Sequence, residues 1–96
     1  MTITPRRVAL EILNKVEKEG IHADEILGKY LKSKSELSSR EKAFITELVY
    51  GILRWRDAID WVIEQFSTYP HRRISRQVRN ILRIGIYQVL YLSRTP

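Results

Sequence analysis

The C-terminal third of the sequence carries a row of arginines whose spacing suits a polyanion. The row consists of Arg72, Arg76, Arg79 and Arg83. Because residues three or four apart share one side of a helix, a helical segment would align these guanidinium groups as a basic ridge. A guanidinium group pairs bidentately with phosphate oxygens and stacks on bases, which a lysine ammonium does not do. We therefore interpret the ridge as a surface for RNA, with a merely solvated helix face as the alternative.

Three further arginines extend this prediction. In a compact bundle, the end of the helix predicted over 39–54 would lie near the start of the helix predicted over 72–92, which would gather a patch rather than a row. The RNA-binding residues that we predict are Arg54, Arg56, Arg72, Arg73, Arg76, Arg79 and Arg83. Arg83 has a second interpretation, because it lies close to Gly85 and the expected core, where it would anchor a carbonyl or a carboxylate.

The overall charge also indicates an anionic partner. The 96 residues include 17 Lys and Arg against 11 Asp and Glu, a net charge of +6, and every basic residue after Lys42 except His71 is an arginine. Such a basic half predicts nucleic acid as the most common partner. The absence of cysteine excludes disulfides, thiolate metal sites and a cysteine nucleophile, and fits a cytoplasmic protein. No apolar run approaches the ~20 residues that span a membrane.

The residue patterns of common enzymes are missing. His22 and His71 stand in unrelated contexts, and a metal site needs more ligands at set spacing. Neither a glycine-rich nucleotide loop nor a serine elbow occurs. Asp57 and Asp60 lie three apart, but the arginines beside them favour salt bridges over acid–base chemistry. We therefore predict no catalytic residue, no metal site and no cofactor site in this chain.

The spacing of apolar residues predicts an all-α fold of about five helices. Thr4 and Pro5 suit the start of the first helix, Gly20 suits its end, and Ser38 with Glu41 forms a capping box before the third. No segment alternates apolar and polar residues as a strand would. The predicted helices cover residues 5–19, 23–32, 39–54, 56–66 and 72–92. We expect one compact helical domain over residues 1–96.

The same spacing predicts which residues are buried. The last helix should turn an apolar stripe toward the core, consisting of Val78, Leu82, Gly85, Val89 and Leu92. Interior glycines cost about 1 kcal/mol relative to alanine, so Gly51 and Gly85 predict a close approach between the third and fifth helices. Trp55 is expected to continue the buried face of the third helix, and Phe66 to point inward from the fourth.

Three other aromatic side chains have more than one interpretation. Trp61 falls opposite the inward face of its helix, so it either covers another helix or contacts a partner domain. Tyr87 and Tyr91 lie four residues apart and away from the apolar stripe, where they serve as core, as stacking surfaces for RNA or as an interdomain contact. We predict all three as candidate partner contacts.

Several segments resemble one family over nearly the whole chain. They are REKAFITELVYGILRW, the following DAIDWVI, and VRNILRIGIYQVLYLSRTP, with RRVALEILNKVEKEGIHADEIL at the start. These segments resemble the N-terminal domain of the bacterial ribosomal RNA cytosine-5 methyltransferases B, also called Sun or Fmu. That domain is similar in fold to the transcription antitermination protein NusB, a helical RNA-binding protein. The resemblance therefore implies a NusB-like helical domain that binds RNA.

The resemblance also implies where the chemistry lies. The family's domain continues past its arginine-threonine-proline segment with further helices, then a catalytic domain that binds S-adenosylmethionine. We therefore expect the last helix of this chain to lack part of its cover. Methylation at cytosine carbon 5 needs a thiolate to attack carbon 6, which a chain without cysteine cannot supply.

We thus expect an accessory domain that positions small-subunit ribosomal RNA for a separate methyltransferase domain. Its partners would be ribosomal RNA, that catalytic domain and, as a further option, a second copy of the chain, with no membrane involved. The alternatives are a protein-interaction or dimerisation module that docks a catalytic domain, or a NusB-like transcription antitermination factor.

Overall fold

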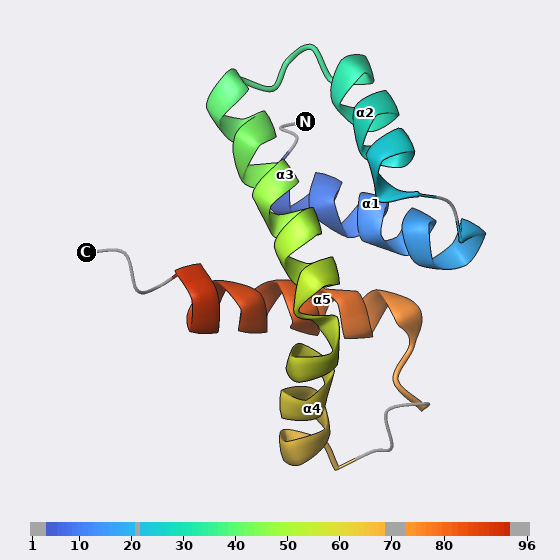
Figure 1. Cartoon of the computed structure of the whole chain (residues 1–96), viewed down its shortest axis with the longest axis vertical. Helices are drawn as coiled ribbons and strands as arrows, with labels where there is room; N and C mark the ends of the chain where they lie inside the picture. The colour runs from blue at the N-terminus through green and yellow to red at the C-terminus, as the bar shows by residue number, and fades with distance from the viewer. Residues whose placement is uncertain (1–3, 21, 69–72, 93–96) are drawn as a thin grey trace.

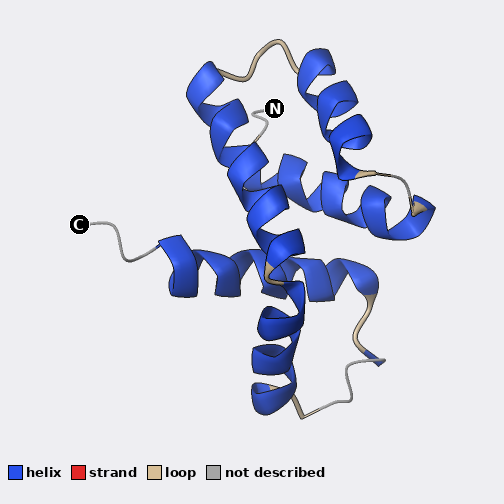
Figure 2. Ribbon diagram, viewed as in Figure 1, coloured by secondary structure: helices blue, strands red, loops and turns tan. Residues whose placement is uncertain are grey.

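The computed structural model describes residues 4–20, 22–68 and 73–92, and within these ranges it contains helices and no strand (Figure 2). The helices are α1 (Pro5–Glu19), α2 (Ala23–Ser33), α3 (Ser39–Arg54), α4 (Arg56–Phe66) and α5 (Arg76–Tyr87), and α5 continues into a π-helical turn, η2 (Gln88–Leu92). The predicted all-α fold is therefore confirmed, and α3 and α4 have the predicted boundaries.

α1 begins and ends where the sequence predicts. The Thr4 hydroxyl accepts a hydrogen bond from the Arg7 N–H at 3.3 Å, and Pro5 occupies the first turn. Gly20 follows the last turn with a φ of 65°, a left-handed conformation that glycine adopts without steric cost. The helix packs against α2, α3 and α5. Its buried side chains are Val8, Ala9, Ile12 and Leu13.

α3 crosses α1 and is the central helix of the structure (Figure 1). It starts with the predicted capping box, in which the Ser38 hydroxyl accepts from the Glu41 N–H at 3.1 Å and the Glu41 carboxylate accepts from the Ser38 N–H at 2.8 Å. On the α2 side, the Tyr50 hydroxyl donates to Asp24. The buried side chains of α3 are Ile45, Leu48, Val49 and Ile52.

Trp55 alone separates α3 from α4, and α5 runs across the chain near this junction (Figure 1). α5 packs against α1, α3 and α4. The Ser75 hydroxyl caps α5 by accepting from the Val78 N–H at 3.2 Å, so the helix begins at Arg76. This start lies four residues after the predicted one at Arg72, which is outside the described residues.

The predicted buried stripe of α5 is wrong. Val78, Leu82 and Val89 are 48%, 38% and 66% exposed, and Gly85 is also exposed. Of the stripe, Leu92 packs against the core. The inward face combines polar and apolar side chains, namely Asn80, Arg83, Ile84 and Tyr87. It can be buried because other helices supply hydrogen-bond partners for its polar groups.

Two aromatic predictions also fail. Trp55 is 44% exposed, because it lies in the break between two helices rather than on the inward face of α3. Phe66 is 85% exposed. It is the last residue of α4, which extends beyond the helices that cover it (Figure 1). The buried face of α4 consists only of Ile59 and Ile63.

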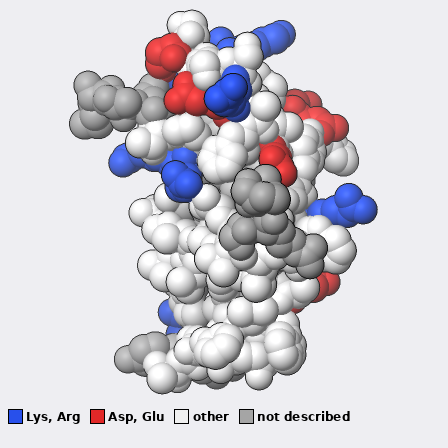
Figure 3. Space-filling view, turned by 90° about the vertical axis from the view of Figure 1, so that its left-hand side faces the viewer, with Lys and Arg blue, Asp and Glu red and all other residues white. Residues whose placement is uncertain are grey.

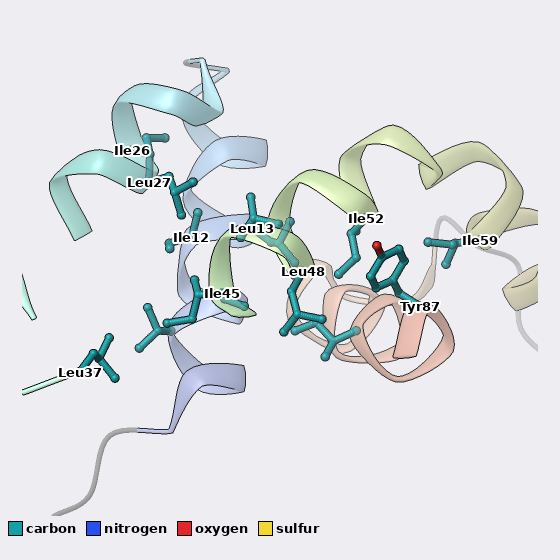
Figure 4. Packing of buried hydrophobic residues seen from close by; sticks show 14 of the residues in the cluster. Ile12, Leu13, Ile26, Leu27, Leu37, Ile45, Leu48, Ile52, Ile59 and Tyr87 are labelled. Carbon is teal, nitrogen blue, oxygen red and sulfur yellow. The ribbon is translucent and has the colours of Figure 1, made fainter. Parts of the chain in front are cut away.

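Gly51 allows α5 to approach α3 closely. The Tyr87 ring lies so near the Gly51 backbone that a Cβ at this position would overlap the ring. Figure 4 shows the same ring between Ile52 and Ile59 in the core. The predicted close approach is therefore confirmed at Gly51. It is wrong at Gly85, where a Cβ would meet open space.

Replacing Gly51 by alanine should destabilise the fold, because the added methyl group must displace the Tyr87 ring. We expect a loss of about 1–3 kcal/mol, the usual cost of overpacking a core. Gly28→Ala is the matched control, since a Cβ there meets nothing within 4 Å. It should raise stability by up to about 1 kcal/mol through helix propensity. Urea unfolding of both variants measures the difference, and equal stability gains in the two would contradict the role of Gly51.

Candidate nucleic-acid interface

Arg83 joins α5 to α4 and to α1. Its Nε donates to Asp60 Oδ1 at 2.8 Å and its Nη2 donates to Asp60 Oδ2 at 2.7 Å, which makes a bidentate pair. Its Nη1 donates to Asn80 Oδ1 at 2.8 Å and to Glu17 Oε1 at 3.3 Å. Arg83 is buried. The interpretation of Arg83 as an anchor for a carboxylate is therefore the one that the structure shows.

Glu17 of α1 forms ion pairs with the other two arginines of α5. Arg79 Nη2 donates to Glu17 Oε2 at 2.5 Å, and Arg76 Nε lies 3.7 Å from the same oxygen. Asn80 Nδ2 donates to Asn14 Oδ1 at 2.8 Å, which adds a second link between α1 and α5. We call the set of Glu17, Asp60, Arg79, Asn80 and Arg83 the interhelical network.

The interhelical network buries two of the arginines of the predicted basic ridge and leaves others exposed. The side chains of Arg79 and Arg83 are only 15% and 8% exposed, so their charges are neutralised inside the fold. Arg76 remains 44% exposed. Arg73 is exposed before the start of α5, and Arg72 lies outside the described residues. The described surface at the start of α5 therefore presents Arg73 and Arg76, and the continuous ridge is not observed.

Arg54 and Arg56 are exposed on either side of Trp55 in the chain. Within residues 4–20, 22–68 and 73–92, no acidic side chain forms an ion pair with either of them. The Arg54 guanidinium lies over the Trp55 ring, 5.7 Å from its centroid. The Trp55 ring stacks on Tyr91. Tyr91 lies fifteen residues after Arg76, which corresponds to roughly 20 Å along a helix. Among the described arginines, Arg54 and Arg56 therefore lie apart from Arg76. The prediction of one patch also includes Arg72, which lies outside the described residues, so that prediction stays open.

Three aromatic rings form a stack that we call the aromatic column, made up of Tyr87, Tyr91 and Trp55. The centroids of Tyr87 and Tyr91 are 5.2 Å apart, and those of Tyr91 and Trp55 are 5.5 Å apart, with interplanar angles of 24° and 17°. Tyr87 is buried, so its core interpretation is the observed one. Trp61 is 62% exposed on α4, and its contact with a partner stays a prediction.

A groove between the start of α1 and α5 is flanked by two arginines that the predicted site does not include. Its volume is about 530 Å³, and Arg6, Arg7 and Gln88 are among its lining residues. Arg6 Nε donates to Gln88 Oε1 at 3.0 Å, and its guanidinium lies 5.5 Å from the centroid of Phe44. Arg7 pairs with Glu11 at 3.6 Å. The adjacent arginines at the start of the first predicted helix were the sequence signal for this region.

The outer side of α5 and η2 bears an apolar groove of about 510 Å³. It is lined by Val62, Ile81, Leu82, Gly85, Ile86, Val89 and Leu90. On the face shown in Figure 3, charged side chains gather in the upper part, and the lower part is largely uncharged. The residues that line this groove are exposed or half-buried.

Neither a metal cluster nor a membrane span is present in the described ranges 4–20, 22–68 and 73–92. No three His, Cys, Asp or Glu side chains there come together in a way that could hold a metal ion. None of the helices in these ranges combines the length and the apolar character needed to cross a membrane.

Comparisons with known proteins agree with the resemblance seen in the sequence. Residues 3–96 match the model of the NusB family. The "Probable ribosomal RNA small subunit methyltransferase B" of Bacillus subtilis is 35% identical over 91 residues, and that of Synechocystis sp. is 33% identical over 94 residues. The "Ribosomal RNA small subunit methyltransferase B" of Escherichia coli O1:K1 is 29% identical over 91 residues.

These alignments cover 95%, 98% and 95% of this chain but only 20%, 21% and 20% of the three relatives. The chain therefore spans about a fifth of the length of the curated relatives that it matches. No solved structure matched the chain. The matches confirm the resemblance to the methyltransferase B proteins that the segments LVYGILRW and LRIGIYQVLYL predicted.

The interhelical network should make stability depend on the charge of Glu17. Burial raises the pKa of Glu17, but the hydrogen bond from Arg79 and the charges of Arg79 and Arg83 outweigh it, so the pKa lies below the ordinary 4.5. A lowered folded-state pKa stabilises the fold above the unfolded-state pKa. That stability is lost as the pH falls through the folded-state value.

Glu17→Gln should therefore lower the free energy of unfolding at pH 7 by about 2 kcal/mol, the worth of hydrogen bonds between charged groups. The difference from the wild type should shrink toward zero as the pH falls below 4.5, because Glu17 itself becomes neutral. Glu64→Gln is the control, since Glu64 is exposed. Denaturant titrations across pH test this, and a pH-independent deficit in Glu17→Gln would contradict it.

Proposed function

This chain belongs to the NusB family, and we propose that it is an RNA-binding domain that positions small-subunit ribosomal RNA for cytosine-5 methylation. The names of its relatives support the ribosomal RNA context. The observation that carries the proposal is the pair of exposed arginines at the α3–α4 junction, Arg54 and Arg56, which no described acidic side chain neutralises. An unpaired guanidinium group is free to take a phosphate oxygen as its partner.

Only the exposed arginines among those described can contact RNA in this proposal. Arg79 and Arg83 stabilise the fold through Glu17 and Asp60. The proposed RNA contacts are therefore made by exposed arginines, namely Arg54, Arg56, Arg73 and Arg76, with Arg6 and Arg7 as a second edge. Such side chains grip phosphates by releasing counterions, which holds an RNA in place without reading its sequence.

Catalysis belongs to another domain in this proposal. The attacking thiolate cannot come from a chain without cysteine. We assign that thiolate and the S-adenosylmethionine site to a separate methyltransferase domain in the cytoplasm. This chain would then act by raising the local concentration of RNA near the catalytic site and by fixing its orientation.

Removing both junction charges should weaken RNA binding and flatten its salt dependence. For Arg54→Gln/Arg56→Gln, the slope of log affinity against log salt should fall by about 1.4, since each contact with a single strand contributes about 0.7. Binding of a small-subunit ribosomal RNA fragment over a salt series provides the measurement.

The matched control is Lys32→Gln/Arg40→Gln, which removes the same charge near the other end of α3. Arg40 lies fourteen residues before Arg54, about 21 Å along the helix. This control should keep most of the affinity. Equal losses in the two double variants would indicate nonspecific charge attraction and count against the assigned surface.

A second candidate function is supported by the apolar groove on α5. The groove has a volume of about 510 Å³ and an apolar lining, and Val89, one of its lining residues, is 66% exposed. Exposed apolar surface of this kind is typical of protein contacts. Because the relatives are about five times as long as this chain and are named methyltransferases, we propose the methyltransferase domain as the occupant.

Val89→Asp should abolish binding to a methyltransferase domain that is encoded with this chain and produced separately. Burying a carboxylate against apolar side chains costs far more than such a contact returns. Val78→Asp is the control, since Val78 on α5 is 48% exposed but does not line the groove. Calorimetry measures the binding, and light scattering of the chain alone detects the competing outcome, a second copy in the groove.

A further inference from the structure

We propose that Trp55 is a stacking platform for one base of a single-stranded RNA segment, with Arg54 and Arg56 holding the flanking phosphates. This inference rests on the proposed RNA-binding function and deepens it, because it specifies the form of RNA and the place where a base is held. Three features of Trp55 support the inference: its ring is held by stacking, it is exposed to solvent, and arginines precede and follow it in the chain.

The aromatic column fixes the orientation of the Trp55 ring. Its inner end is the Tyr87 ring, which lies against Gly51 in the core. Tyr91 stacks on Tyr87, and Trp55 stacks on Tyr91 with only 17° between the ring planes. A platform whose rotamer is fixed by packing loses little conformational entropy when a ligand binds. The column therefore supplies a preorganised aromatic surface that begins in the core and ends at solvent.

The outer end of the column is accessible and positively charged. Trp55 is 44% exposed, whereas Tyr87 is 6% exposed. The Arg54 guanidinium lies over the Trp55 ring at 5.7 Å, in the position that a stacked base would share or take over. A guanidinium group stacks on indole rings and also pairs with phosphate oxygens, so Arg54 can leave the ring for a flanking phosphate when a base takes its place on Trp55. Arg56, the next residue in the chain, adds a second exposed guanidinium.

This combination favours a single strand over a duplex. The bases of an RNA helix are stacked on each other and offer only their edges, whereas unpaired bases are free to stack on aromatic side chains. Aromatic rings beside basic side chains are the usual arrangement in proteins that bind single strands. An exposed tryptophan also suits a protein contact, but the arginines on both sides of Trp55 have no acidic partner in the described ranges, which favours a polyanion.

Tryptophan fluorescence tests the inference directly. The sequence has two tryptophans, so Trp61→Phe leaves Trp55 as the single reporter. Addition of an oligouridylate of about 12 nucleotides should quench this fluorescence, because the base stacks on the indole ring. An RNA duplex of the same length should quench it far less at equal saturation. Equal quenching by duplex and single strand would overturn the assignment of a single-stranded ligand.

Affinity measurements with labelled oligouridylate complete the test. Trp55→Ala should lower the affinity between about five-fold and a hundred-fold, while Trp55→Tyr should retain most of it because the ring can still stack. Trp61→Ala is the control, since Trp61 is 62% exposed, more than Trp55, but lies outside the column. Thermal unfolding of each variant establishes that the fold persists, and Trp55→Tyr preserves the column if Trp55→Ala does not fold.

The outcomes separate this inference from the function on which it rests. Unchanged affinity in Trp55→Ala, with RNA binding otherwise intact, overturns the stacking platform and leaves the RNA-binding function standing. No binding of RNA by the wild type overturns both. Loss of binding to the methyltransferase domain in Trp55→Ala, with RNA affinity unchanged, would show that the platform serves a protein instead.

Discussion

The buried guanidinium of Arg83 is the interaction on which the arrangement of helices depends. It bridges Asp60 on α4 and Glu17 on α1, so one side chain of α5 connects three helices. A buried charge is tolerated only when its hydrogen-bonding groups are satisfied, and the two carboxylates and Asn80 do this for Arg83. Apolar contacts alone would allow α5 to rotate about its axis. The directional hydrogen bonds of the network instead specify which face of α5 points inward.

That orientation explains the two surfaces of the molecule. Because α5 buries Asn80 and Arg83, it turns Leu82 and Val89 outward, which creates the apolar groove. The same rotation places Tyr87 against Gly51 and gives the aromatic column its buried end. The proposed RNA surface at the α3–α4 junction and the proposed protein surface on α5 thus both follow from one network. In the proposed function, the α3–α4 junction would hold RNA and the apolar groove would hold a catalytic domain.

The sequence predicts the parts of this structure that depend on local signals. The capping box at Ser38 and Glu41 fixes the start of α3, and Gly20 ends α1, so both boundaries are read correctly. The face of α5 was predicted wrongly because its burial depends on residues far away in the chain. Glu17 lies 66 residues from Arg83, and Asp60 lies 23 residues from it. Helical periodicity contains no information about such partners, so it predicts the apolar stripe as the inward side. The stacking of Trp55 on Tyr91 likewise joins residues far apart in the chain, so helical spacing does not predict it.

The most direct test of the account is amide and indole NMR spectroscopy of the 96-residue chain during titration with a single-stranded fragment of small-subunit ribosomal RNA. The account predicts that the largest shift changes occur at the Trp55 indole N–H and the backbone amides of Arg54 and Arg56. Amides of the α2–α3 connection should remain unchanged. Shift changes confined to the α2–α3 connection, or none at all at saturating RNA, would contradict the claim that the α3–α4 junction is the RNA-binding surface.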